Sequence, residues 1–230
     1  MRMFEILDPN YIAHMPDAHK AVAKNNGIAI TPDTYKQLAM VQQIKEECQP
    51  WLQQVDNKPF TQFPVYRGIG GHRKMFIEKQ VRLDGRKPKD STLALHGFMN
   101  NYFKKQFGAP FRNSLFVSSE IDQASEYAVD GSVYIVIPQG NFKYIWSPEY
   151  ADLLDGIHEF HLADVTELSN ASNLEEFEDN VLGTYKNTDL IGAIQAEHEI
   201  MVRCQSYLGI NYTIDLTQAH FKMFEELLVA

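Results

Sequence analysis

The sequence has few cysteines, no long apolar run and no internal repeat. Cys48 and Cys204 are too few for the disulfide framework of a small secreted domain, so they predict reduced thiols in the core of a cytoplasmic protein. No 18-residue apolar stretch occurs, and therefore no membrane-spanning helix is predicted. Residues 1–10 lack the apolar run of a signal peptide. His158 and His161 have no second pair of ligands beside them in the sequence, so no metal site is predicted.

Positive charge is scarce over most of the chain but abundant in one segment. The 230 residues carry a net charge of −9, which argues against broad affinity for nucleic acid. In residues 67–112, however, eleven Lys and Arg face only three acids, so this segment carries +8 and the remainder −17. An anionic ligand or partner for this segment and a plain solvated basic surface both remain open.

The length and the hydrophobic pattern predict an α+β protein. Residues 1–58 are predicted to form a helical region, with Leu38, Val41 and Ile44 on one apolar face, that packs on a core made by residues 59–230. Strands are expected at residues 63–69, 115–118, 133–137, 142–146, 200–203 and 207–214. Helices are expected from a cap at residue 90 or 91 to Gly108, at 121–128, from Pro148 onward and at 216–229. Residues 70–89 are expected to be a loop, and the acidic residues 164–180 a solvated helix or loop.

Three short pieces carry the clearest functional pattern. The first is Val65-Tyr66-Arg67-Gly68, the second is a strand that ends in Ser118-Ser119, and the third is Glu197-His198-Glu199. An arginine, then a serine, then Glu-x-Glu on a strand is the order found in ADP-ribosyltransferases that use NAD. The chain resembles the arginine–serine–glutamate branch of that family, in particular the transferases of phages and bacterial toxin systems. The resemblance covers roughly residues 60–215 and implies a split β-sandwich fold.

The first two pieces are implied to bind the dinucleotide. By resemblance Arg67 is a cofactor-binding residue, and its guanidinium can fork two hydrogen bonds to phosphate or ribose oxygens. Tyr66 and Gly68 flank it, and Gly68 allows the backbone to come close to a ligand. Ser118 is implied to orient the catalytic glutamate and to support the nicotinamide ribose, with Ser119 beside it. The family usually has Ser-Thr-Ser here, whereas this chain has Ser-Ser-Glu, and a helix-capping role for Ser118 is the simpler alternative.

The third piece is implied to carry the chemistry. Glu197 and Glu199 are two apart, so on a strand both carboxylates would point to one face, about 7 Å apart. By resemblance Glu199 is the catalytic residue, which binds the ribose 2′-hydroxyl and stabilises the cation formed when nicotinamide leaves. Glu197 is implied to orient or deprotonate the acceptor. Tyr185 lies in the loop upstream and is a candidate for target recognition by aromatic stacking, with an ordinary surface tyrosine as the alternative.

The sequence therefore predicts a mono-ADP-ribosyltransferase that uses NAD as a substrate, needs no metal and works in the cytoplasm, which is the bacterial host cytosol for a phage or toxin protein. Protein arginine is favoured as the acceptor because of Glu197. A nucleic-acid base is the alternative because of the basic segment 67–112. An NAD glycohydrolase and a non-enzymatic virion or interaction module are further alternatives, and an antitoxin or inhibitor partner is left open.

Overall fold

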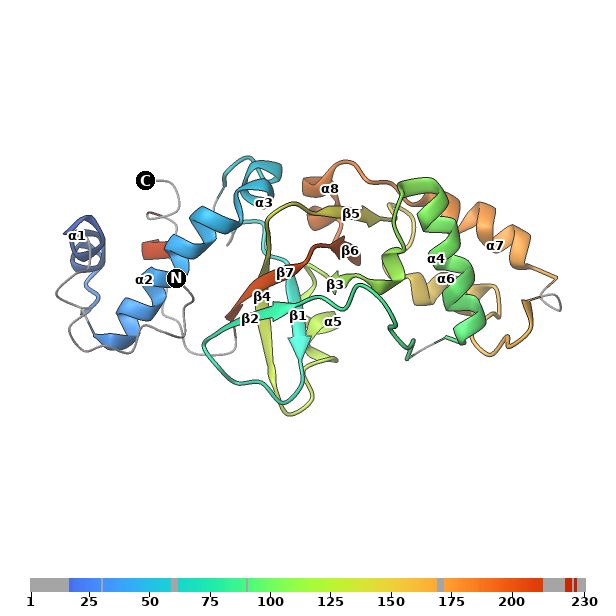
Figure 1. Ribbon diagram of the computed structural model, residues 1–230, viewed down its shortest axis with the longest axis horizontal. Helices are drawn as coiled ribbons and strands as arrows, with labels where there is room; N and C mark the ends of the chain where they lie inside the picture. Colours follow the sequence, from blue (N-terminus) through green and yellow to red (C-terminus); the bar gives the residue numbers. More distant parts are fainter. Residues whose placement is uncertain are drawn as a thin grey trace.

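Two antiparallel sheets occupy the middle of the molecule, and helices lie at both of its ends (Figure 1). The computed structural model describes residues 17–29, 31–58, 62–89, 91–168, 172–212, 222–224 and 226. The α-helices are α1 (Asp17–Asn25), α2 (Pro32–Glu47), α3 (Gln49–Gln54), α4 (Leu93–Phe107), α5 (Ile121–Ser125), α6 (Leu153–Glu159), α7 (Leu174–Asn180) and α8 (Leu190–Gln195). The strands are β1 (Tyr66–Ile69), β2 (Phe76–Gln80), β3 (Leu115–Val117), β4 (Ser132–Gln139), β5 (Lys143–Trp146), β6 (Ile200–Arg203) and β7 (Ser206–Asn211). Two 3₁₀ helices complete the named elements, η3 (Phe111–Asn113) and η5 (Leu182–Thr184). The expected α+β class is confirmed, with antiparallel sheets.

The two sheets meet where two of the sequence-predicted pieces come together. The larger sheet has the order β1-β4-β7-β2, and the smaller sheet has the order β3-β6-β5. Tyr66 opens β1 and Ser118 follows β3, and the two form an isolated antiparallel bridge. The Tyr66 N–H donates to the Ser118 carbonyl at 2.6 Å, and the Ser118 N–H donates to the Tyr66 carbonyl at 3.1 Å. Residues that lie far apart in the sequence are thereby held side by side.

Helices α2 and α3 share a hydrophobic core with the larger sheet. Leu38, Val41 and Ile44 are all buried, so the apolar face expected from their spacing is confirmed. The Gly140 N–H after β4 donates to the Glu47 carbonyl at 2.6 Å, which ties the end of α2 to the sheet. Cys48 is buried in this core as a free cysteine, as is Cys204, which confirms the expected position of both in the core.

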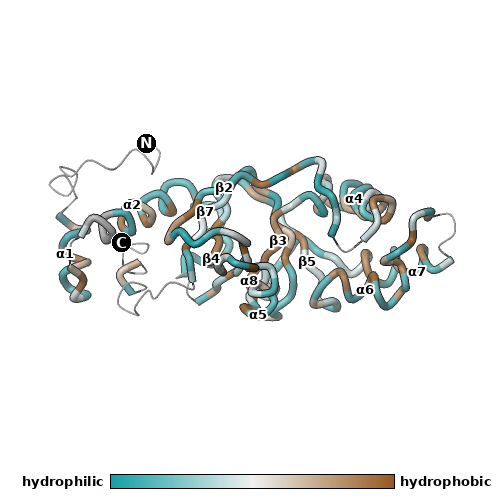
Figure 2. Tube along the Cα trace, turned by 90° about the horizontal axis from the view of Figure 1, so that it is seen from below, coloured by the Kyte–Doolittle hydropathy of each residue, from teal (hydrophilic) through white to brown (hydrophobic). Residues whose placement is uncertain are grey.

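A second core lies on the other side of the smaller sheet. It contains Met99 and Phe103 from α4, Phe177 from α7 and Met201 from β6. Neighbours of Met201 on β6 face the first core instead, because successive side chains of a strand point to opposite faces. Hydrophobic positions recur along the central strands and along α4 and α6 (Figure 2). The smaller sheet is therefore buried on both faces between the two cores.

The structure corrects the expected loop at residues 70–89. Strand β2 forms within it and pairs with β7, with Phe76 opposite Ile210. Only Phe76 and Ile77 are buried in this strand, so its own pattern is too short to predict a strand. The pairing partner comes from the far end of the chain, which is why the sequence pattern did not indicate it.

The end of α4 at Gly108 agrees with the boundary expected from the sequence, but the starts of α4 and α6 differ from those expected. Helix α4 stops where Gly108 adopts a left-handed φ of 75°, as expected, but its cap is Thr92, which accepts the Leu95 N–H. The expected helix start at Pro148 is wrong. Ser147 Oγ accepts hydrogen bonds from the backbone N–H groups of Glu149 and Tyr150, which makes a turn. Helix α6 begins only at Leu153.

The remaining expectations concern the chain's later part. Phe177 of α7 is fully buried in the second core, and Val165, Leu168 and Leu174 pack against that core, so the acidic region expected to be solvated is partly buried. Most of the expected helix at residues 216–229 lies outside the described residues. No helix in the described part of the chain combines the length and the apolar content needed to cross a membrane.

Candidate active-site cavity

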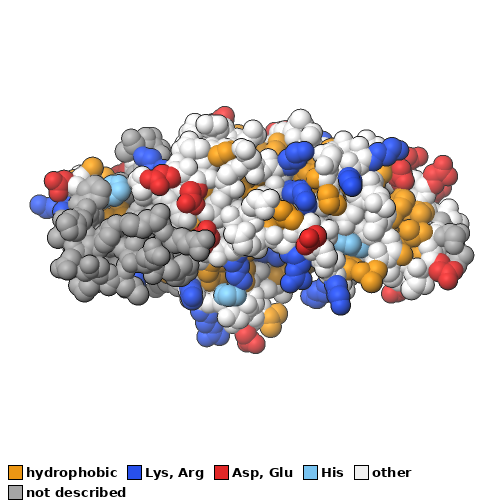
Figure 3. All heavy atoms as spheres, in the orientation of Figure 1, with side chains coloured by type: hydrophobic (Ala, Val, Ile, Leu, Met, Phe, Trp, Pro, Cys, Tyr) orange, Lys and Arg blue, Asp and Glu red, His pale blue; other side chains and the backbone are white. Residues whose placement is uncertain are grey.

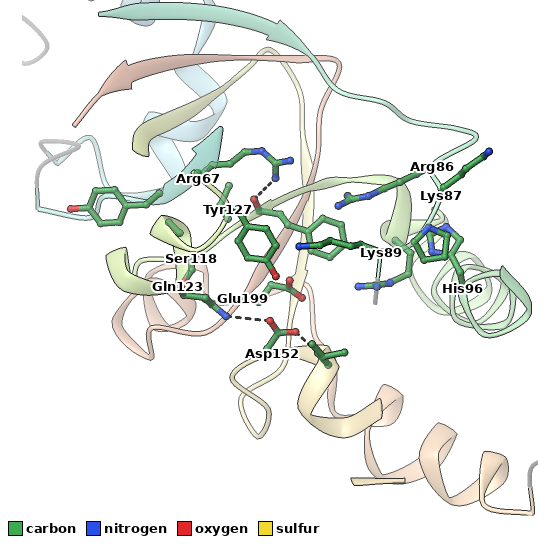
Figure 4. Close-up of a pocket in the computed structure, with 18 residues that line it drawn as sticks. Arg67, Arg86, Lys87, Lys89, His96, Ser118, Gln123, Tyr127, Asp152 and Glu199 are labelled. Atoms are coloured by element: carbon green, nitrogen blue, oxygen red, sulfur yellow. Dashed lines mark hydrogen bonds between the residues drawn. The ribbon is translucent and has the colours of Figure 1, made fainter. Parts of the chain in front are cut away.

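A cavity of about 200 Å³ lies where the two sheets meet. Its lining includes Arg67 from β1, Ser118 after β3 and Glu199 just before β6 (Figure 4). Each of these residues was picked from a different piece of the sequence. The antiparallel pairing of β3 with β6 and the bridge from β3 to β1 bring the three pieces together.

Arg67 is anchored at the cavity by the strand next to it. Its Nη1 donates to the carbonyl of Phe116 at 2.7 Å, and the guanidinium also makes a side-chain hydrogen bond with Tyr207. The sequence predicted that Gly68 lets a ligand approach, but the close neighbour is part of the protein. A Cβ at Gly68 would lie 2.0 Å from the carbonyl oxygen of Ala124 in α5. The glycine therefore lets α5 pack directly on β1, and α5 then forms one wall of the cavity.

Ser118 is buried and holds the backbone before β6. Its Oγ donates to the carbonyl of Glu197 at 3.3 Å and accepts the N–H of Glu120 at 3.0 Å. The second bond resembles the capping role considered as the simpler alternative, since Glu120 is the N-cap residue of α5. The first bond positions the turn that leads into Glu199. Ser118 therefore reaches the glutamate segment through a backbone carbonyl of that segment.

Glu199 presents a carboxyl group whose ionisation is unfavourable in the free protein. Burial raises its pKa to about 8, and the nearby Asp152 contributes to this rise, whereas Arg112 and Arg86 oppose it. One of its oxygens, Oε1, is buried and has no hydrogen-bond partner among the described residues. The Glu199 N–H donates to the carbonyl of Ala151 at 2.7 Å, which places Asp152 beside it. A buried acid of this kind is suited to interact with positive charge on a ligand.

The expectation that Glu197 and Glu199 share one face of a strand is wrong. Strand β6 begins only at Ile200, and Glu197 lies in the turn after α8 with a left-handed φ of 61°. Its side chain is exposed, and it is not among the residues that line the cavity. The helix α8 ends too close to Glu197 for the strand to extend back to it. Glu197 and Glu199 therefore have different environments: the Glu197 side chain is exposed, whereas Glu199 is partly exposed with its Oε1 buried.

Two further residues take structural positions that the sequence did not predict. Tyr185, expected to recognise a target, is 7% exposed and packs against Phe103 with ring centroids 5.1 Å apart. It belongs to the second core and cannot stack on an acceptor from there. Ser119, expected in the cofactor site, donates its hydroxyl to the Ile194 carbonyl of α8 and is not part of the cavity lining.

Cations outnumber acids in the cavity. Among the described residues, the lining contains two acids, Asp152 and Glu199, and five cations, which are Arg67, Arg86, Arg112, Lys87 and Lys89. Arg86, Lys87 and Lys89 come from the connection between β2 and α4, and Lys89 Nζ lies 5.4 Å from the ring centroid of Tyr127 across the cavity. Lys and Arg side chains gather over the middle of the face shown in Figure 3, and most of the acidic side chains visible there lie towards its two ends. Part of the basic segment found in the sequence is thus a cavity wall.

Comparisons with protein-family models, with curated proteins and with solved structures found no match for this chain.

Sequence reasoning did not single out three residues of the cavity. Asp152 reaches it because residues 147–152 run beside His198 and Glu199, and its carboxylate accepts from Leu154 N at 2.8 Å and from Gln123 Nε2 at 3.3 Å. The N-cap role of Asp152 could be predicted from its place before two leucines. Its proximity to Glu199 could not. His96 and Arg112 enter from α4 and η3. Arg112 was noted only as one of eleven basic residues, and His96 carried no signal beyond a position on a predicted helix.

Proposed function

We propose that this chain is a mono-ADP-ribosyltransferase, which breaks the nicotinamide–ribose bond of NAD and transfers ADP-ribose to a macromolecular acceptor. One observation carries the proposal. Arg67, Ser118 and Glu199, which the order of motifs in the sequence singled out, line a single cavity. Three unrelated surface residues from separate parts of a chain would have no reason to converge. The two antiparallel sheets that join at this cavity support the split β-sandwich as the fold.

The charges and donors of the cavity fit a dinucleotide substrate. Five cations can neutralise the two phosphates of NAD, and arginine can fork to phosphate oxygens. Glu199 Oε1 and Arg112 Nε are both buried without a partner among the described residues. Buried polar atoms normally have partners, so unpaired ones in a cavity support a polar ligand there. We assign Arg67 to the phosphates and Glu199 to the ribose.

Glu199 acts in the bond-breaking step. The bond between the ribose C1′ and the nicotinamide nitrogen breaks, and its electron pair leaves with neutral nicotinamide. Positive charge then develops on the ribose, and the Glu199 carboxylate stabilises it through space and through the 2′-hydroxyl. The acceptor's nucleophile forms the new bond to C1′ and loses a proton. The positive nicotinamide ring of the bound substrate favours the ionised form of Glu199, whose pKa in the free protein is about 8.

Protein arginine remains the favoured acceptor. Glu197 lies outside the cavity lining on an exposed turn, where its carboxylate is available to pair with a guanidinium on a docking protein. Its function would then be recognition at the surface, two residues from Glu199. A nucleic-acid base is a second candidate, because the exposed Lys87 and Lys89 lie at the cavity and could contact backbone phosphates.

Transfer of label from NAD tests both the reaction and the acceptor class. The purified protein is incubated with NAD labelled in the adenylate phosphate and with bacterial lysate, and the products are treated with protease or nuclease. We expect protease-sensitive label with the wild-type protein and none with Glu199→Gln. Glu175→Gln, an identical change at an exposed position of α7, is the control and should transfer label as the wild-type protein does.

Other outcomes distinguish the alternatives. Nuclease-sensitive, protease-resistant label would assign a nucleic-acid acceptor. Release of nicotinamide without macromolecular label would indicate a glycohydrolase. Absence of any NAD consumption by the wild-type protein would contradict the proposal and favour a non-enzymatic role.

A further inference from the structure

Three arginines converge on one residue of the cavity. Arg67 Nη1 donates to the Phe116 carbonyl, and Arg86 Nη1 donates to the Ser114 carbonyl, each at 2.7 Å. The guanidinium carbon of Arg86 lies 4.2 Å from the centroid of the Phe116 ring, and that of Arg112 lies 5.1 Å from it. Figure 4 shows Arg67 on one side of the cavity and Arg86 with His96 on the side of α4. Arg67 thus meets the backbone of Phe116, whereas Arg86 and Arg112 lie against its ring.

Among the described residues, the arginines on the side of α4 have no carboxylate partner. In the part of the chain that the structure describes, neither Arg86 nor Arg112 has a carboxylate oxygen within ion-pair distance. Burial lowers the pKa of Arg86 to about 10, and the positive charges of Arg67 and Arg112 contribute to this. Three neighbouring guanidinium groups repel one another in a partly buried site, and a bound anion would relieve that repulsion.

Side-chain hydrogen bonds hold this side of the cavity in shape. Asn100 Oδ1 accepts a hydrogen bond from the backbone N–H of Arg112 at 2.9 Å, and Asn100 Nδ2 lies 3.0 Å from His96 Nε2. His96 is 7% exposed, and its Nε2 also lies 3.1 Å from Asn113 Oδ1. Its other ring nitrogen, Nδ1, is buried without a partner among the described residues, as is Arg112 Nε. The polar groups are therefore arranged in advance, but the Arg112 Nε donor and one ring nitrogen of His96 have no partner in the described part of the chain.

We propose that Arg86, Arg112 and His96 form a second anion subsite, separate from Arg67, that binds a phosphate group. Two planar guanidinium groups and an imidazole offer several donors to the oxygens of one tetrahedral anion. The phosphate could belong to the dinucleotide or to a nucleic-acid acceptor, and the chemistry of recognition is the same. The assignment of the phosphate to NAD rests on the proposed function. The existence of an anion subsite is independent of it.

Binding of inorganic pyrophosphate tests the subsite without any turnover. Titration calorimetry compares the wild-type protein with Arg86→Gln, Arg112→Gln and Lys105→Gln, the last being an equal loss of charge on exposed residue 105 of α4. We expect each arginine variant to weaken binding at least about tenfold, the effect of one charge-assisted hydrogen bond. The Lys105 variant should change affinity by less than about twofold. Equal affinity in all four proteins, or no binding to the wild type, would overturn the proposal.

Two further variants guard against misfolding. Arg86 also supports the Ser114 carbonyl and the Phe116 ring, so its loss could disturb the fold. Arg86→Lys and Arg112→Lys keep the charge, and we expect them to bind pyrophosphate more tightly than the glutamine variants of equal melting temperature. Lysine variants that bind no better than glutamine variants would show that charge at these positions does not hold the anion.

His96 gives an independent spectroscopic signal. Burial lowers its pKa, with Arg112 and Arg86 contributing and a hydrogen bond to Asn113 opposing. Asp152 and Glu199 also line the cavity, and Lys87 and Lys89 add positive charge. A bound anion offsets the repulsion, so saturating sulfate should raise the His96 pKa measured from its imidazole NMR signals. An unchanged His96 pKa, with pKa changes confined to other histidines, would show that His96 is not part of the subsite.

The source of the phosphate is decided by two ligands. If the phosphate belongs to the dinucleotide, Arg86→Gln weakens the binding of ADP-ribose as strongly as that of pyrophosphate. If it is the acceptor, ADP-ribose affinity is unchanged and binding of a short oligonucleotide falls, with a smaller salt dependence. Either result supports the subsite, whereas unchanged affinity for both ligands contradicts it. Pyrophosphate binding that depends on Arg86, in a protein that never consumes NAD, would keep the subsite and refute the transferase.

Discussion

At the scale of single residues, the surroundings of Glu199 oppose the ionisation of its carboxyl group. Burial and Asp152 favour the neutral acid, while Arg112 and Arg86 favour the anion. The balance raises the pKa to about 8, so the group changes its charge close to neutral pH. Both the chemistry proposed for Glu199 and the stability of the protein should therefore depend on this one proton.

Replacing Glu199 by Gln should remove activity while keeping the fold. The carboxylate charge is expected to supply on the order of 3 kcal/mol of transition-state stabilisation, so nicotinamide release should fall by about a hundredfold or more. Single-turnover measurement of nicotinamide release, with circular dichroism of the same sample, provides the check. Turnover near that of the wild type in a folded Glu199→Gln protein would refute the assignment of the catalytic residue.

The same residue should make stability fall as pH rises. The folded-state pKa of about 8 is above the ordinary 4.5, so between these values the folded protein keeps a proton that the unfolded chain has released. The free energy of unfolding should then decrease with pH, by at most about 1.4 kcal/mol per pH unit. Urea unfolding from pH 5 to 8 should show Glu199→Gln gaining stability relative to the wild type at each step. A constant difference across this range would mean that Glu199 titrates near its ordinary value.

At the scale of elements, the contact between β1 and α5 forms one wall of the cavity. It depends on Gly68, where an added Cβ would lie 2.0 Å from a backbone oxygen of α5, an atom that cannot rotate away. Gly97 in α4 is the opposite case, because a Cβ there would meet nothing within 4 Å. The two glycines form a matched pair, since the same substitution should have opposite effects.

We expect Gly68→Ala to lower the free energy of unfolding by about 1–3 kcal/mol, the usual cost of forcing an extra methyl into a packed contact. Gly97→Ala should raise it by about 0.5–1 kcal/mol, because alanine restricts the unfolded chain and favours helix. Urea unfolding of both variants measures the difference. Equal effects of the two substitutions would show that α5 can move away from β1 without cost.

At the scale of the whole molecule, the N-terminal helices and the larger sheet share one core. Cys48 comes from the junction of α2 and α3 and Cys204 from the connection between β6 and β7, yet both thiols are buried in that core. Burial raises the pKa of Cys204 to about 12 and also raises that of Cys48. Because the thiolate is the reactive form, both cysteines should be inert while the core is intact.

Alkylation by iodoacetamide should therefore report one cooperative unfolding event. In native protein neither cysteine should react measurably, and in increasing urea both should become reactive over the same concentration range. Mass spectrometry of the two peptides, with rates in fully unfolded protein as the reference, gives the extent for each site. Reaction of Cys48 at clearly lower urea than Cys204 would show that the helical region unfolds on its own.

The sequence by itself determined the features that depend on local patterns. The buried face of α2 follows from apolar residues at helical spacing, β4 from a continuous β-branched run, and the end of α4 from Gly108. The choice of Arg67, Ser118 and Glu199 as a set also came from short pieces in order, and all three line the cavity. The burial of two free cysteines followed from their number and spacing. Each of these features follows from a local pattern, or from the order and spacing of short pieces along the chain.

The tertiary structure alone decided whatever depends on partners distant in the sequence. Strand β2 exists because β7 pairs with it, and Tyr185 is buried because the second core closes around it. Glu197 leaves the strand because α8 ends just before it, and Asp152 meets Glu199 only through the chain that runs beside β6. The cations of one basic segment reach the cavity because the connection from β2 to α4 passes along it. Such contacts depend on how the segments pack together, and no local pattern of residues contains that information.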